Sequence, residues 1–179
     1  MSAWMLGADY LEYIHDALVA LLWPNTEPVG DHEQRDRSMI ESAAARPFHS
    51  AFHEDAYPSI PEKAIALFHS VNANHAFTNG NKRTAVIAAD HFLMANDYCL
   101  VLPNGEMYKV AEKTASYKMR GLSQDESLAE IKDAIGQHVF SFSDVEKSTA
   151  NDSKFADIMQ RLCELRDYIR TNPANSLKE

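Results

Sequence analysis

The chain has 179 residues, 45% of them hydrophobic and 24% charged, which suits one globular domain with its own core and a small extension. Its formal net charge of −9 argues against broad binding to a nucleic-acid backbone, because such binding needs a basic face. No segment approaches the roughly 18 uninterrupted apolar residues of a membrane span, and the N-terminal stretch is acidic where a signal peptide is basic, so the sequence predicts a cytoplasmic protein without direct contact to nucleic acid or membrane.

Two helices are predicted in the first quarter of the chain. Segment 9–22 places its apolar residues on one helical face, and Asp9 followed by Glu12 has the spacing of a capping box. Residues 23–33 contain two prolines and a glycine and are predicted to form a loop. A second helix is predicted over 37–45, because apolar residues recur there at helical spacing and a proline follows.

The middle of the chain combines a polar connection with two further helices. Residues 48–58 are polar and aromatic without a clean period, so they are predicted to form an exposed loop or a short hairpin. A helix follows over 60–72, with Ser59 and Glu62 spaced as a capping box. The next helix, over 81–95, is apolar nearly all round at its centre, which is typical of a central buried helix.

The pattern becomes less regular beyond the buried helix. Two short extended segments are predicted at 98–102 and 107–110, with the strong turn signal Pro103-Asn104-Gly105 between them. Further helices are expected over 111–120 and 128–139.

The C-terminal region changes in composition. Residues 141–153 are polar and acidic and are predicted to be a linker. A last helix over 155–170 has an apolar face, which we expect to pack on the chain's own domain. The patterns together predict an all-α fold with a small β-hairpin, divided into a domain over 1–140, the linker, and a helical extension over 154–179.

One stretch has the features of a phosphate site. The turn Asn79-Gly80-Asn81 leads straight into the buried helix, whose first N–H groups lack partners and carry the positive end of the helix dipole. Lys82 and Arg83 add two positive charges there, and His75, a few residues upstream, is placed to act as a base. The simpler alternative is that the turn only caps the helix and the basic side chains are solvated.

The stretch from His75 to Ala85 resembles the motif of the Fic/Doc family, His-x-Phe-x-(Asp/Glu)-Gly-Asn-(Gly/Lys)-Arg, and its ending Asn81-Lys82-Arg83-Thr84-Ala85 is similar to the Doc (death-on-curing) branch. Flanking segments extend the resemblance over roughly residues 9–137: Arg35-Asp36, Ile40-Glu41-Ser42-Ala43, Arg46-Pro47, Pro61-Glu62-Lys63-Ala64 and Asn96-Asp97-Tyr98. The family implies a mainly helical enzyme that transfers part of a nucleotide, often the AMP of ATP, to a protein hydroxyl. Its Doc branch instead moves the γ-phosphate of ATP to a threonine of a translation factor.

The resemblance also implies a role for each matched residue. His75 would be the general base that takes the hydroxyl proton. Phe77 would anchor the loop in the core, while Gly80 and Asn81 would shape the backbone cradle for the phosphates. Arg83 would pair with phosphate oxygens, for which a forked guanidinium is well suited.

Two positions bear on which group is transferred. AMP-transferring members of the family have Gly at the position of Lys82, where a lysine narrows the phosphate cradle so that the nucleotide presents its γ-phosphate. They also have a second arginine where Val86 stands. The resemblance therefore favours transfer of phosphate from ATP to a Ser/Thr hydroxyl, with AMP transfer as the alternative.

Asn79 departs from the family pattern. Active members usually have an acidic residue there to hold Mg²⁺, whereas asparagine offers one neutral oxygen. ATP is the expected cofactor, and three alternatives stay open for Mg²⁺: weak binding at Asn79, binding through the nucleotide phosphates themselves, or no metal at all. A further alternative is a catalytically attenuated module that binds a nucleotide or a partner protein.

Partners follow from the same resemblance. The self-inhibitory motif (Ser/Thr)-x-x-x-Glu-(Gly/Asn) of many Fic proteins occurs nowhere in the chain, which favours a separate antitoxin. The target would be a hydroxyl group of another protein, such as a translation factor. The loop 47–58 lies where the family's target-docking flap would be, and its competing interpretation is a plain connection.

Overall fold

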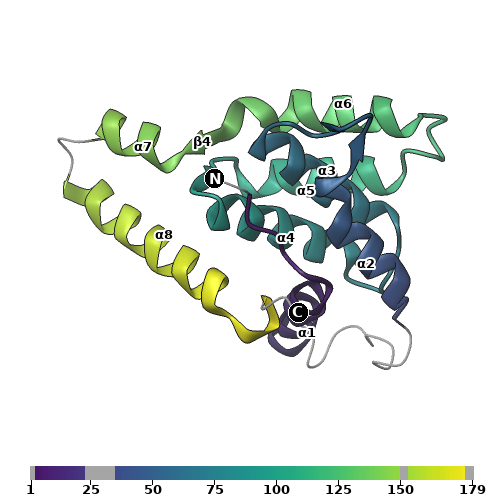
Figure 1. Ribbon diagram of the computed structural model, residues 1–179, viewed down its shortest axis with the longest axis horizontal. Coiled ribbons are helices and arrows are strands. Elements are labelled where there is room, and N and C mark those ends of the chain that lie inside the picture. The colour runs from purple at the N-terminus through teal and green to yellow at the C-terminus, as the bar shows by residue number, and fades with distance from the viewer. Residues whose placement is uncertain (1–2, 23–34, 150–152, 176–179) are drawn as a thin grey trace.

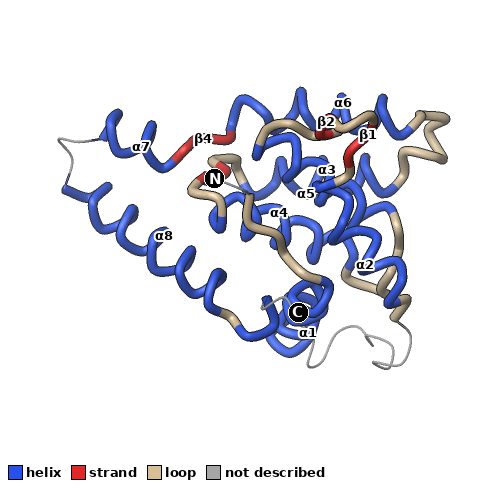
Figure 2. Tube along the Cα trace, in the orientation of Figure 1, coloured by secondary structure: helices blue, strands red, loops and turns tan. Residues whose placement is uncertain are grey.

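The computed structural model describes residues 3–22, 35–149 and 153–175, and this part of the chain is built mainly from helices (Figure 1, Figure 2). The helices are α1 (Ala8–Leu22), α2 (Arg37–Ala45), α3 (Ile60–Ala73), α4 (Asn81–Ala95), α5 (Asn104–Ala115), α6 (Gln124–Ile135), α7 (Phe142–Thr149) and α8 (Ser153–Thr171). Two antiparallel strand pairs accompany them: β1 (Ser50–Ala51) with β2 (Glu54–Asp55), and β3 (Tyr98–Leu100) with β4 (Val139–Ser141). The predicted mainly helical fold is confirmed, and none of the described helices is long and apolar enough to cross a membrane.

Helix α4 lies at the centre of the fold (Figure 1). It packs against α1, α3, α5, α8 and β3. Its residues Ala85, Ala88 and Ala89 are at most 2% exposed, and such small side chains let neighbouring helices approach closely. Phe92 and Leu93 continue the buried face toward the end of the helix. The prediction of a central buried helix is confirmed, so the first turn of α4 is fixed by packing on several sides.

The predicted capping boxes have different outcomes. Before α3 the box is confirmed, because Ser59 Oγ accepts a hydrogen bond from Glu62 N at 3.3 Å and the Glu62 carboxylate accepts one from Ser59 N at 3.2 Å. The box of Asp9 and Glu12 is wrong, because α1 begins one residue before Asp9. Both carboxylates instead bind Arg37 of α2, at 2.6 and 3.0 Å, and so join the first two helices.

The polar connection after α2 contains a short hairpin, one of the two structures predicted for it. Strands β1 and β2 pair directly, and the two residues between them, Phe52 and His53, have φ angles of 53° and 67°. Positive φ at both central residues is what a two-residue hairpin turn requires. Phe52 at the tip is 98% exposed. The loop predicted over 23–33 lies outside the described residues.

Of the two extended segments predicted at 98–102 and 107–110, the second is wrong. Strand β3 pairs with β4, which follows α6 in the chain, and residues 107–110 lie inside α5. Met107 and Ala111 are buried against α4 at a helical spacing of four residues. Pro103, interpreted as part of a turn, directly precedes the first turn of α5, a place where a proline costs no backbone hydrogen bond.

The two helices predicted after this segment lie earlier in the chain than expected. Helices α5 and α6 replace those predicted over 111–120 and 128–139. A capping box starts α6, because Ser123 Oγ accepts a hydrogen bond from Glu126 N at 3.2 Å and the Glu126 carboxylate accepts one from Ser123 N at 2.8 Å. This pair has the serine-to-glutamate spacing of the box before α3.

The last helix packs on its own chain, as predicted. Ile169 of α8 is fully buried, and the Arg170 guanidinium donates two hydrogen bonds to the Ala95 carbonyl oxygen at the end of α4. Arg170 also binds the Asp97 carboxylate at 2.9 Å. Helix α7 occupies most of segment 141–153, which was predicted as a linker, and the division of the chain at this segment stays a prediction.

Candidate functional site

The loop between α3 and α4 is fastened by the first residue of α4. Asn81 Nδ2 donates to the Phe77 carbonyl oxygen at 2.6 Å, and Asn81 Oδ1 accepts from Phe77 N at 3.0 Å. Phe77 itself is 3% exposed. The Asn81 side chain therefore fixes the loop, and its backbone N–H belongs to the first turn of the helix.

A second fastening comes from α1. His15 Nε2 donates to the Asn79 carbonyl oxygen at 3.1 Å, and its ring stacks on Phe77 with centroids 4.1 Å apart and an interplanar angle of 5°. His15 is 4% exposed, and burial lowers the pKa of its imidazole below the usual range. No motif in the sequence marks His15, and its signal is its place between Ile14 and Leu18 on an apolar helix face.

Two residues of the loop have a left-handed backbone. Gly80 has a φ of 80° and His75 a φ of 52°, a conformation that costs a non-glycine residue about 1 kcal/mol or more. The exposed His75 side chain lines a cavity of about 320 Å³ at the start of α4. All the residues predicted to act on or bind phosphate line this same cavity: His75, Asn79, Gly80, Asn81, Lys82 and Arg83.

The first turn of α4 has the donors of an anion site. Gly80 is the N-cap residue and has no side chain that could cap the helix. The first helical hydrogen bond runs from Thr84 N to the Gly80 carbonyl oxygen at 2.9 Å. The N–H groups of residues 81–83 therefore lie where the helix supplies no acceptor, at the positive end of its dipole. Lys82 and Arg83 extend from this turn, an arrangement that favours phosphate.

The Asn79 side chain makes a hydrogen bond within the loop. Its Oδ1 accepts a hydrogen bond from the Gly80 N–H at 2.7 Å, so its neutral oxygen is used within the loop. Mg²⁺ prefers carboxylate and water oxygens in octahedral geometry. In the part of the chain that the structure describes, no three His, Cys, Asp or Glu side chains are grouped to hold a metal ion. Weak binding of Mg²⁺ by Asn79 stays a prediction.

Helix α5 contributes a neighbouring set of polar groups. Lys82 Nζ lies 3.8 Å from Glu112 Oε1 and 5.9 Å from the centroid of the Tyr108 ring. A hydrogen bond to the Glu112 carboxylate raises the pKa of the Tyr108 hydroxyl. Sequence reasoning missed both residues, because four of the twelve residues of α5, 107–110, are predicted as an extended segment. Nothing in the local pattern places this part of the chain beside the motif.

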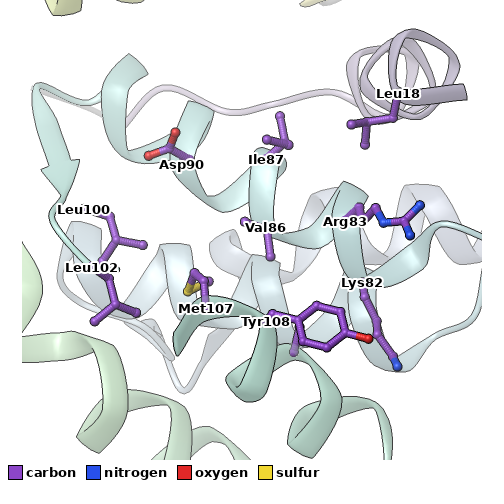
Figure 3. A pocket seen from close by; sticks show the side chains of 11 residues that line it. Leu18, Lys82, Arg83, Val86, Ile87, Asp90, Leu100, Leu102, Met107 and Tyr108 are labelled. Carbon is purple, nitrogen blue, oxygen red and sulfur yellow. The ribbon is translucent and has the colours of Figure 1, made fainter. Parts of the chain in front are cut away.

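A second cavity, of about 380 Å³, adjoins the first. Lys82, Arg83 and Tyr108 line both. The second cavity continues along α4 past Val86 to Asp90 (Figure 3). Burial raises the pKa of the Asp90 carboxyl to about 6. The two basic side chains at the start of α4, Lys82 and Arg83, thus line both cavities.

Comparisons with known proteins identify a matching family and a relative. The model of the Fic/DOC family matches residues 5–93, a segment that contains the whole loop from His75 to Arg83. Toxin Doc of Mycolicibacterium smegmatis is 45% identical over 67 residues, which are 37% of this chain and 52% of that protein, so the match spans about half of the relative's length. No solved structure matches the chain. The match to the family model and the identity with Toxin Doc show that the chain belongs to the Fic/DOC family.

Proposed function

We propose that the chain is a Doc-like toxin that transfers phosphate from ATP to a Ser or Thr hydroxyl of a target protein, with His75 as general base. One observation carries the proposal: His75 and Lys82 line the same cavity of about 320 Å³ at the start of α4. A base, a cationic side chain and a helix N-terminus then meet at one place, which is the set of groups that phosphoryl transfer needs.

The proposed reaction follows from these positions. The His75 imidazole takes the proton of the target hydroxyl while the hydroxyl oxygen attacks the γ-phosphorus of ATP. The bond from the γ-phosphorus to the bridging oxygen breaks, and ADP leaves. The N–H groups of residues 81–83, with Lys82 and Arg83, bind the phosphate oxygens and stabilise their charge.

Lys82 favours phosphate over AMP transfer within this proposal. Its ammonium group sits beside the helix start, 3.8 Å from Glu112, and it occupies space that a glycine would leave to the phosphates. AMP transfer by the same base remains the close alternative, and the two reactions differ only in which phosphorus of ATP is attacked.

A silent or attenuated module is the second candidate, and the Asn79 geometry favours it. The Asn79 oxygen accepts a hydrogen bond from its neighbour Gly80, so the chain offers little to a metal ion that would neutralise phosphate charge. Under this proposal the cavity binds a nucleotide without rapid turnover.

A separate antitoxin partner is part of the first proposal. The relative from Mycolicibacterium smegmatis is named a toxin, and the chain contains no self-inhibitory Fic motif in its sequence. We therefore expect a second protein to restrain the activity, and we propose a translation factor as the class of target.

A labelling experiment tests the proposed reaction. Purified protein is incubated with a bacterial lysate, Mg²⁺, and ATP labelled at either the γ- or the α-phosphate. We expect label on protein from the γ-position only, and its loss in His75→Ala, because the hydroxyl then has no base.

The matched control is His138→Ala, which removes a histidine that does not line the motif cavity. Transfer from the α-position would replace the proposal with AMP transfer. Absence of label from both positions, with nucleotide binding intact, would favour the attenuated module.

A further inference from the structure

The cavity beyond the motif has an apolar middle. Val86 and Ile87 of α4 form one wall, and Leu100, Leu102 and Met107 form the other (Figure 3). Its volume of about 380 Å³ lies in the range of sites for small molecules. An apolar group therefore fits the middle of this cavity better than phosphate does.

The two ends of the cavity are polar and opposite in charge. Lys82 and Arg83 lie at one end and Asp90 at the other, as Figure 3 shows. Arg83, Val86 and Asp90 follow one another at intervals of three and four residues, so they share a face of α4. The seven residues from Arg83 to Asp90 correspond to a rise of about 10 Å along the helix.

Asp90 has no hydrogen-bond or ion-pair partner among the described residues, although it is partly buried. Burial is also what raises its pKa to about 6. A carboxylate on the wall of an apolar cavity without a partner destabilises the folded state. Such a group is a candidate for binding a ligand, and its chemistry calls for a hydrogen-bond donor at this end.

We propose that this cavity binds the adenine base of the ATP whose phosphates lie at the start of α4, and that Asp90 accepts a hydrogen bond from the 6-amino group of the base. The proposal rests on the proposed function, because it takes ATP as the substrate. The arrangement places the phosphates at Lys82 and Arg83, the base between the apolar walls, and its amino group at Asp90. Asp90 then determines which base is accepted.

Inosine triphosphate is the sharpest probe, because its base has a carbonyl oxygen where adenine has the 6-amino group, with a proton on N1. That oxygen would face the Asp90 carboxylate with no donor between them. We expect ATP to bind the wild-type chain about tenfold or more tightly than inosine triphosphate, the effect of one charge-assisted hydrogen bond. Asp90→Asn should reduce this ratio to about threefold or less, because an amide can donate to the oxygen as readily as it accepts from the amino group.

Binding is measured by calorimetry in the His75→Ala background, so that no turnover is needed. The charge control is Asp133→Asn, an exposed residue of α6, which should leave the ratio unchanged. Val86→Phe fills the cavity and should lower the affinity for ATP to that for inorganic tripolyphosphate, while tripolyphosphate binds as in the wild type. Met119→Phe, on the exposed surface, is its control, and circular dichroism confirms that each variant is folded.

The outcomes separate this proposal from the function on which it rests. If ATP and tripolyphosphate bind the wild type equally, or if Val86→Phe leaves ATP affinity unchanged, the cavity is not the base site and the phosphate chemistry at His75 stands. An unchanged ratio of ATP to inosine triphosphate in Asp90→Asn would also overturn the proposal. If neither ATP nor tripolyphosphate binds, both the base site and the ATP-dependent function are wrong.

Discussion

Asn79 accepts a hydrogen bond from the Gly80 N–H at 2.7 Å, and an aspartate can accept the same bond in the same position. Asn79→Asp is therefore expected to keep the loop geometry and to add the negative charge that Mg²⁺ prefers. We expect the initial rate of label transfer to rise about tenfold or more, with the thermal midpoint within about 2 °C of the wild type. The control is Gln137→Glu, which adds the same negative charge at an exposed position outside the loop. An unchanged rate would mean that the amide does not limit the native activity.

Asp90 makes the stability of the chain depend on pH. Its folded-state pKa is raised to about 6 from 3.8, so the folded state holds the proton more tightly than the unfolded state does. Its contribution to stability is therefore greatest below pH 3.8 and is lost as the pH rises through 6. Asp90→Asn should raise the free energy of unfolding by about 1 to 3 kcal/mol at pH 8, with the difference closing near pH 4.

Urea denaturation at pH 8 and pH 4 measures this effect. Asp133→Asn, which is exposed, should show no such difference between the two pH values. Equal stability of wild type and Asp90→Asn at pH 8 would mean that the carboxylate is solvated. If Asp90→Asn is more stable than the wild type and also discriminates less between ATP and inosine triphosphate, the loss of discrimination is not caused by unfolding. The binding role of Asp90 is then separate from any role in folding.

The site residues that sequence reasoning found are those adjacent in the chain. His75 to Arg83 form one continuous loop and helix start, so their proximity needs no knowledge of the tertiary fold. His15 and Tyr108 reach the site from α1 and α5, and their contacts with Phe77 and Lys82 depend on how distant helices pack. Such contacts cannot be inferred from local periodicity alone.

At the scale of whole elements, short-range signals predicted structure better than patterns that depend on distant partners. The caps before α3 and the hairpin turn at Phe52 are local, and both are present. Strand β3 finds its partner in β4, beyond two helices, and nothing near residues 98–110 indicates that pairing. Segment 107–110 contains apolar residues that suit a strand or a helix equally, and packing against α4 decides for the helix.

Helix α8 is joined to the end of α4 through Asp97, which binds Arg166 at 2.7 Å and Arg170 at 2.9 Å. Asp97 has a φ of 64°, and asparagine tolerates this backbone equally well, so Asp97→Asn isolates the charge. We expect the free energy of unfolding to fall by about 1 kcal/mol or less in dilute buffer, since the pair is partly exposed. The loss should shrink in 1 M salt because of screening, at a Debye length of about 3 Å.

Urea titrations at the two salt concentrations measure this change. Asp167 binds only one of the two arginines, Arg166, from an exposed position on the same helix, so Asp167→Asn should change stability by less than Asp97→Asn. A loss in Asp97→Asn that persists undiminished at high salt would indicate a packing effect in place of an ionic one.

At the scale of the whole molecule, the motif lies where four helices converge. Helices α3 and α4 carry the loop, α1 holds it through His15, and α5 supplies the wall next to Lys82. The two cavities on either side of Lys82 and Arg83 therefore share walls from α4 and α5. Substitutions that shift α5 against α4 should affect both spaces together.

Helix α1 is also where both ends of the described chain meet. Gly7 N, just before the helix, donates to Asn175 Oδ1 at 3.2 Å, and residues Pro173–Asn175 pack against α1. During synthesis, at about 5 to 20 residues per second, α1 leaves the ribosome before α4, and α4 before residues 173–175. The His15 support of the loop can thus form on a nascent chain as soon as α4 emerges, whereas residues 173–175 pack against α1 only after α8 has emerged.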